Sequence, residues 1–98
     1  MELYVIRRPS GWETDKELEV AAGRSAQVGD EEMSSDIRWI RSYVVREADG
    51  TLGTFCIYQA SSEEKIREHA QRAGLPATEV FLVLDTVVVR PDPVAAAA

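Results

Sequence analysis

The residues with the strongest capacity for chemistry in this 98-residue sequence are its one cysteine and its one histidine. Thiolates and imidazoles bind divalent transition metals, and the same pair can serve as a nucleophile and its base when the two lie within hydrogen-bond reach. Cys56 and His69 cannot by themselves complete a closed four-ligand site, so a metal would also need oxygen ligands, water or a second subunit. We predict them as ligands for a divalent transition metal, and nickel, copper, cobalt and zinc all suit such a mixed set of nitrogen, oxygen and sulfur ligands. The alternative for each is an ordinary buried residue.

The segment that contains Cys56 reads as one strand of a β-hairpin. Two runs rich in β-branched and aromatic residues, 37–47 and 52–60, flank Asp49-Gly50, a dipeptide typical of the type I′ turn. A turn centred there pairs positions whose numbers sum to 99. Because side chains alternate along a strand, this register predicts one face suited to an organic ligand. That face holds Trp39, Arg41, Tyr43, Cys56 and Tyr58.

The elements that must position these residues alternate in the order β-α-β-β-α-β. We predict strands at 2–8, 37–47, 52–60 and 80–89, a helix from a cap at Thr14 to about Met33, and a second helix between Ser61 and Gly74. This order is typical of an α+β, ferredoxin-like sandwich, in which two helices cover one face of a four-stranded antiparallel sheet. The predicted domain spans residues 1–90, and residues 91–98 are predicted to be a disordered tail.

The predicted sheet has a helix-free face that needs cover. The last strand, 80–89, is apolar on both of its sides, and in this topology it lies at an edge of the sheet. An exposed apolar edge or face promotes association with another chain. We therefore predict a homodimer.

The position of His69 leaves two arrangements open. Its helical spacing from Ile66 and Ala73 turns the imidazole inward. If the second helix covers the Tyr43 and Cys56 side, the histidine, the thiol and a tyrosine or carboxylate converge; otherwise the mixed face becomes the dimer interface. Three arginines, Arg7, Arg8 and Arg41, could hold an anionic substrate, although we expect ordinary surface positions for them.

Composition excludes some classes of partner. The formal net charge of −6 disfavours binding to nucleic acid or to an anionic membrane, because both require clustered basic residues. The start of the sequence has no signal-peptide pattern, and no apolar run reaches membrane-spanning length. One cysteine cannot form an intrachain disulfide. We expect a cytoplasmic protein.

Four segments resemble the DUF4242 family of small nickel-binding or nickel-responsive proteins. They are residues 1–8, 37–44, 55–60 and 66–76, with Ser42-Tyr43, Cys56-x-Tyr58 and Glu68-His69 as the most specific elements. The resemblance implies a ferredoxin-like fold, a homodimer and nickel binding. We predict a small dimeric nickel-binding protein for sequestration or sensing, with Tyr43 and Tyr58 lining the site. Alternatives are a small-molecule binding module or cofactor-free enzyme that uses a Tyr43, Cys56 and His69 pocket, and an interaction domain in which the cysteine and histidine are simply packed.

Overall fold

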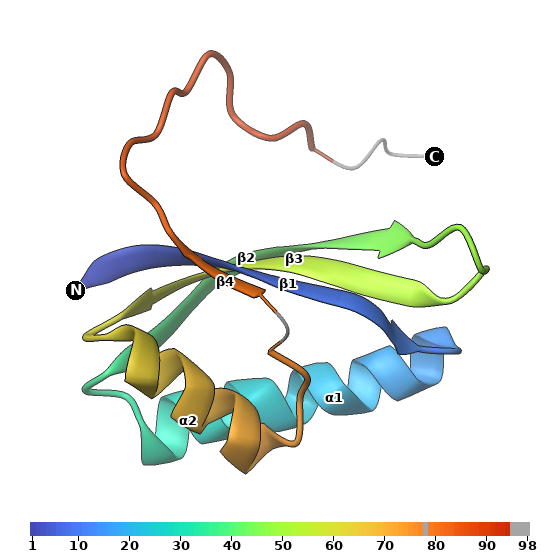
Figure 1. Cartoon of the computed structure of the whole chain (residues 1–98), viewed down its shortest axis with the longest axis horizontal. Coiled ribbons are helices and arrows are strands. Elements are labelled where there is room, and N and C mark those ends of the chain that lie inside the picture. The colour runs from blue at the N-terminus through green and yellow to red at the C-terminus, as the bar shows by residue number, and fades with distance from the viewer. Residues whose placement is uncertain (78, 95–98) are drawn as a thin grey trace.

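One antiparallel sheet with two helices on a single face makes up the fold (Figure 1). A computed structural model describes residues 1–77 and 79–94. The strand order is β2-β3-β1-β4, which confirms the predicted α+β, ferredoxin-like topology with the last strand at an edge. In chain order the elements are β1 (Glu2–Trp12), α1 (Asp15–Gln27), the π-helical turn η1 (Val28–Glu32), β2 (Ile37–Arg46), β3 (Leu52–Ala60), α2 (Glu63–Ala73) and β4 (Glu79–Leu82).

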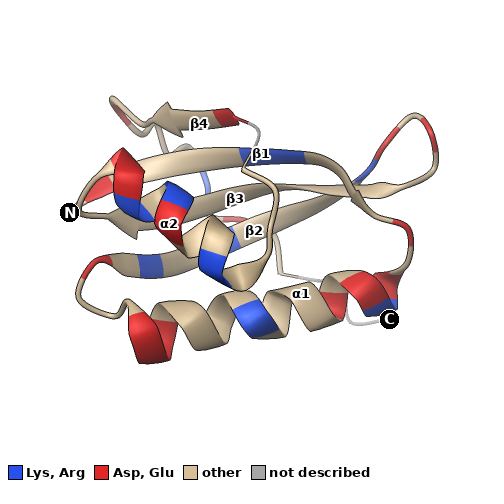
Figure 2. Cartoon of the chain, turned by 60° about the horizontal axis from the view of Figure 1, so that its bottom comes forward, with Lys and Arg blue, Asp and Glu red and all other residues tan. Residues whose placement is uncertain are grey.

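Local capping interactions fix where the helices begin and end. Thr14 and Glu17 form the predicted capping box, in which each side chain accepts a hydrogen bond from the other residue's backbone N–H. Helix α2 begins one residue later than predicted, because Ser62 accepts from the backbone of Lys65. It ends at Gly74, whose φ of 70° confirms the predicted left-handed stop. Acidic side chains lie at both ends of α1 (Figure 2).

The predicted hairpin forms, but its predicted register is wrong by one residue. Gly50 has a φ of 88°, whereas Asp49 does not have the positive φ that a type I′ turn requires. The backbone N–H of Gly50 donates to the carbonyl of Glu47, and the N–H of Glu47 donates to the carbonyl of Thr51. A three-residue loop therefore joins the strands, and paired positions sum to 98. Cys56 lies opposite Ser42 instead of Tyr43.

A second irregularity in the hairpin moves Trp39 to the helix-covered face. The pairing shifts between Trp39 and Arg41, so that Ile40 is the extra residue of a β-bulge and Trp39 lies opposite Tyr58. Trp39 thus shares a face with Cys56 and Tyr58, while Arg41 and Tyr43 lie on the helix-free face. The single face predicted for these five residues is wrong, because one residue of slip and one bulge each reverse the side-chain alternation.

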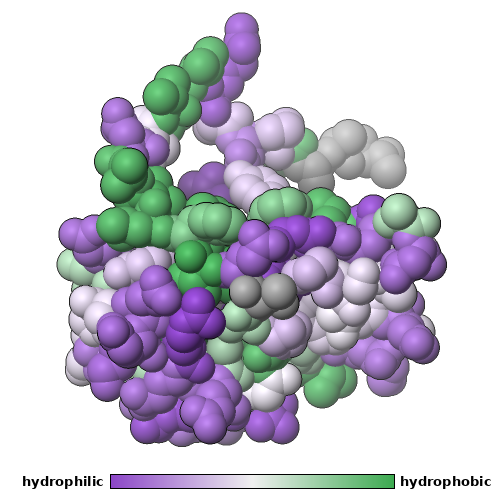
Figure 3. Space-filling model, viewed as in Figure 1, coloured by the Kyte–Doolittle hydropathy of each residue, from purple (hydrophilic) through white to green (hydrophobic). Residues whose placement is uncertain are grey.

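The apolar C-terminal run forms a shorter strand than predicted. Strand β4 ends at Leu82, which pairs with Tyr4, and the backbone N–H of Val83 makes one further hydrogen bond to the carbonyl of Leu3. Beyond Leu82 the chain leaves the sheet and arches over the helix-free face (Figure 1). Figure 3 shows hydrophobic side chains along this departing segment, and Leu84 is 91% exposed. Of the predicted tail, residues 95–98 lie outside the described part of the chain.

The core lies between the sheet and the two helices. It consists of apolar side chains from every layer: Tyr4, Ile6, Val28, Met33, Ile37, Cys56, Tyr58, Ala60, Ile66 and Ala73. Within the described residues, no helix combines the length and apolar character needed to cross a membrane.

Candidate functional site

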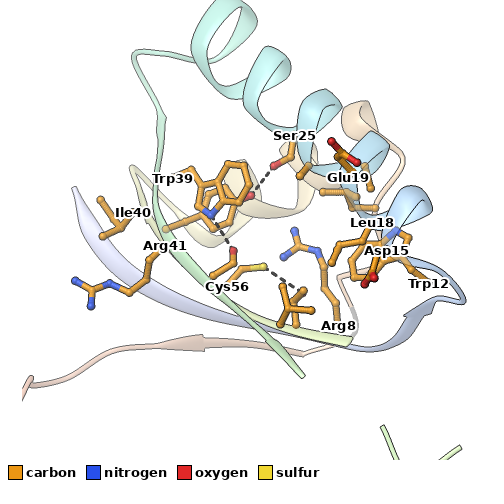
Figure 4. Close-up of a pocket in the computed structure, with 17 residues that line it drawn as sticks. Arg8, Trp12, Asp15, Leu18, Glu19, Ser25, Trp39, Ile40, Arg41 and Cys56 are labelled. Atoms are coloured by element: carbon orange, nitrogen blue, oxygen red, sulfur yellow. Dashed lines mark hydrogen bonds between the residues drawn. The ribbon is translucent and has the colours of Figure 1, made fainter. Parts of the chain in front are cut away.

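A cavity of about 550 Å³ lies between α1 and the hairpin, on the helix-covered side of the sheet (Figure 4). This volume is within the range of small-molecule sites in proteins. Helix α1 forms one wall with small and apolar side chains, and β2 and β3 form the other. The lining includes Arg8, Leu18, Ala22, Trp39, Cys56 and Tyr58, together with Asp15 and Glu19 from α1 and Arg41 from β2.

Two stacked aromatic rings form part of the hairpin wall. The rings of Trp39 and Tyr58 are nearly parallel, with an interplanar angle of 3° and a centroid distance of 5.9 Å. The indole Nε1 of Trp39 donates a hydrogen bond of 2.8 Å to the Ser42 hydroxyl, which holds the ring in place. Because its one polar atom is already bonded, the indole offers an apolar surface to the cavity.

A hydrogen-bonded chain connects Tyr58 and His69 through Ser25. The hydroxyls of Tyr58 and Ser25 share a hydrogen bond of 2.6 Å, and Nε2 of His69 donates to the Ser25 carbonyl over 3.0 Å. The two rings also lie with centroids 5.2 Å apart. Burial raises the pKa of Tyr58 to about 12 and lowers the pKa of His69 below 6.5. Both side chains are therefore neutral at pH 7.

Helix α2 thus covers the side of the sheet that carries Cys56 and Tyr58, which was one of the two arrangements open for His69. Cys56 is buried and donates a hydrogen bond of 3.2 Å to the Thr54 hydroxyl. Across residues 1–77 and 79–94, no group of three or more His, Cys, Asp or Glu side chains is placed to hold a metal ion. Nε2 of His69 is bound to a carbonyl, so Nδ1 is the imidazole nitrogen that keeps a lone pair, and the role of Cys56 and His69 as ligands stays a prediction.

The other predicted ligand-binding residues lie on the opposite face of the sheet. Tyr43 and Arg41 both donate to the Asp92 carboxylate, over 2.7 Å and 2.8 Å, and these bonds tie the C-terminal segment to β2. The hydroxyl of Tyr43, and then Arg41, hold the pKa of Asp92 below 3.8. A pocket built from Tyr43, Cys56 and His69, as the sequence suggested, does not form, since the sheet separates the tyrosine from the other two.

Arg8 is the residue whose position departs most from expectation. Sequence reasoning placed it at the surface, yet its side chain is 0% exposed and lines the cavity (Figure 4). The signal that could have found it is strand alternation, because Tyr4 and Ile6 precede it on the same face of β1 and both are buried. Its guanidinium carbon lies 5.8 Å from the centre of the Tyr58 ring, within cation–π range.

The strand order and the cavity together define a ferredoxin-like α+β protein with a small-molecule-sized cavity beneath one helix. The chain belongs to the family described as nickel responsive protein, SCO4226-like, whose model matches residues 4–83. Among solved structures it is similar to SCO4226 from Streptomyces coelicolor A3(2), with a TM-score of 0.69 and 20% sequence identity. The alignment covers 87% of this chain and 99% of that one, and at this identity it shows the fold alone. A search of curated proteins found no match.

Proposed function

We propose that this protein binds a small organic molecule in the cavity between α1 and the hairpin. The observation that carries the proposal is the cavity itself, about 550 Å³ of space bounded by Leu18, Ala22 and the indole of Trp39. Apolar walls combined with a few polar groups are the usual composition of a ligand site. The protein would act as a binding module, since Cys56 in the cavity lining donates a hydrogen bond to Thr54 and His69 is bonded to the Ser25 carbonyl.

A neutral fluorescent probe tests this proposal without assuming the identity of the ligand. N-phenyl-1-naphthylamine should bind the wild type with one site per chain, and Ala22→Phe should abolish binding because the new ring occupies the cavity. Val20→Phe is the matched control, since it adds a similar bulk at a residue that is 60% exposed and outside the cavity lining. Equal binding by Ala22→Phe and the wild type would refute the proposed site.

Nickel binding is the second candidate, and membership of the nickel responsive protein family supports it. Binding through Cys56 would require the thiol to lose the proton that it donates to Thr54, whereas Nδ1 of His69 could bind nickel while Nε2 keeps its bond to the Ser25 carbonyl. Thermal unfolding with nickel, zinc and cobalt chloride measures this directly, because an ion that binds the folded state raises the melting temperature. A nickel shift lost in both Cys56→Ala and His69→Ala would support these two residues as ligands. No nickel shift in the wild type would refute nickel binding.

We also propose that the protein is a homodimer and that it resides in the cytoplasm. A homodimer would cover the helix-free face and the apolar segment after β4, where Leu84 and Val87 are largely exposed. Cytoplasmic residence agrees with the reduced, buried thiol of Cys56.

A further inference from the structure

Arg8 is a buried cation whose guanidinium has no hydrogen-bonding partner among the described residues. Nε, Nη1 and Nη2 of its guanidinium make no hydrogen bond to any described residue, and the side chain is 0% exposed. A guanidinium does not lose its proton at physiological pH, so the charge remains when the group is buried. Buried charges in proteins are normally paired, because desolvation is strongly unfavourable for an isolated ion.

The surroundings of Arg8 compensate this charge only in part. The face of the Tyr58 ring gives a cation–π contact, and both His69 and Tyr58 are neutral neighbours at pH 7. Asp15 and Glu19 line the same cavity from the acidic first turns of α1, and neither is bonded to the guanidinium. Figure 4 shows Arg8 rising from β1 into the space between α1 and the Trp39 indole.

We propose that the cavity binds a small organic monocarboxylate, with the carboxylate paired to the Arg8 guanidinium and an apolar body against Trp39. This proposal rests on the proposed function and names the class of ligand. A guanidinium presents donors in a planar fork that matches a carboxylate, and the pairing is strongest where water is excluded. Arg8 is 0% exposed, so neighbouring side chains at the inner end of the cavity must shift for the anion to reach its guanidinium.

The charges and the lining favour this class over other anions. A single buried cation neutralises a single negative charge, and the carboxylates of Asp15 and Glu19 at the lining repel a multiply charged anion more strongly than a singly charged one. Apart from Arg8, the one other cation among the described lining residues is Arg41 at the bulge, and its guanidinium is paired with Asp92. An apolar body with one carboxylate fits both observations.

The contribution of the ligand's charge to binding can be measured with two probes of nearly equal shape, 4-phenylbutanoate and the neutral 4-phenylbutanamide. Calorimetric titration of the full chain at pH 7 should show the carboxylate binding at least ten-fold more tightly than the amide. Arg8→Met should reduce this preference to about one, whereas Arg38→Met should keep it. Arg38 is an exposed residue of β2, so its substitution changes the net charge equally and leaves the cavity unaltered.

The outcomes separate this inference from the proposed function. Equal binding of the two probes to the wild type would overturn the monocarboxylate proposal while leaving the cavity as a neutral small-molecule site. Failure of these probes and of N-phenyl-1-naphthylamine to bind would overturn both. The comparison within the wild type decides the question even if Arg8→Met does not fold.

Discussion

Lowering the pH from 7.5 to 5.5 should destabilise the protein through His69. The imidazole is 1% exposed, and burial is the main cause of its lowered pKa, with the charge of Arg8 acting in the same direction. The hydrogen bond to the Ser25 carbonyl opposes these effects without cancelling them. In the unfolded chain the histidine titrates near its ordinary value of about 6.5. Below that pH the unfolded state binds a proton that the folded state binds less readily, so stability falls as the pH falls.

The upper limit of this loss follows from the linkage relation. If His69 stays neutral in the folded state down to pH 5.5, protonation of the unfolded state removes about 1.4 kcal/mol between pH 7.5 and 5.5. For a chain of this length, each kcal/mol corresponds to roughly 4 to 8 °C in melting temperature. The loss is smaller if the folded state begins to protonate within this interval.

Urea unfolding at pH 7.5, 6.5 and 5.5 measures the loss, with His69→Gln as the control. Glutamine keeps an N–H donor for the Ser25 carbonyl but does not titrate. This is the one histidine of the sequence, and Asp49 and Asp92, whose pKa values are held below 3.8, stay ionised throughout the interval. We expect the wild type to lose stability relative to the variant as the pH falls. Parallel losses in the two proteins would refute a buried, neutral imidazole.

Three further substitutions test other parts of the structure. Ser25→Ala should lower the free energy of unfolding by roughly 1 to 3 kcal/mol, because the buried Tyr58 hydroxyl loses its hydrogen-bonding partner. A loss below about 0.5 kcal/mol, half the value of an ordinary hydrogen bond, would contradict that bond. Gly74→Ala should cost about 1 kcal/mol in the same urea assay, since φ is 70° and the added methyl meets only Arg24 at 4.0 Å. Leu84→Asp should halve the mass found by light scattering if the exposed segment joins two chains, and a monomeric wild type would exclude the homodimer.

Local sequence signals were sufficient for the topology, because each helix and strand is marked by residues close to it in sequence. Thr14 with Glu17 and Gly74 act within a single turn of helix, so their roles follow from spacing alone. The hairpin register did not follow, since Asp49-Gly50 is compatible with two loop lengths. The hairpin has the three-residue loop, in which Gly50 is the one residue with a positive φ. The pairing is therefore shifted by one residue, so that each side chain of β2 next to the loop lies on the opposite face from the one predicted relative to β3.

The bulge at Ile40 could not be predicted, because its cause is tertiary. Trp39 gains a stacked contact with Tyr58 and a hydrogen bond to Ser42 only when an extra residue turns it toward the helices. Nothing in the sequence near Tyr58 or Ser42 indicates that either residue contacts Trp39. The one-residue slip at the loop places Arg41 opposite Ile57 on the helix-free side, where it meets Asp92. The bulge thus helps to form one wall of the cavity, and the loop register forms, on the other face, the anchor of the C-terminal segment.

For Arg8, the sequence predicts the direction of the side chain but not the partner of its charge. Alternation with Tyr4 and Ile6 indicates that its side chain points toward the helices. Alternation does not indicate whether the fold places a carboxylate beside the guanidinium. In the folded chain none of the described residues supplies one, although Asp15 and Glu19 are close enough to line the same cavity. A buried charge that folding leaves uncompensated lowers stability, and a methionine would fill the position without that penalty. If the charge is to be neutralised, the compensating group must come from a ligand, and the cavity that adjoins Arg8 provides the space for it.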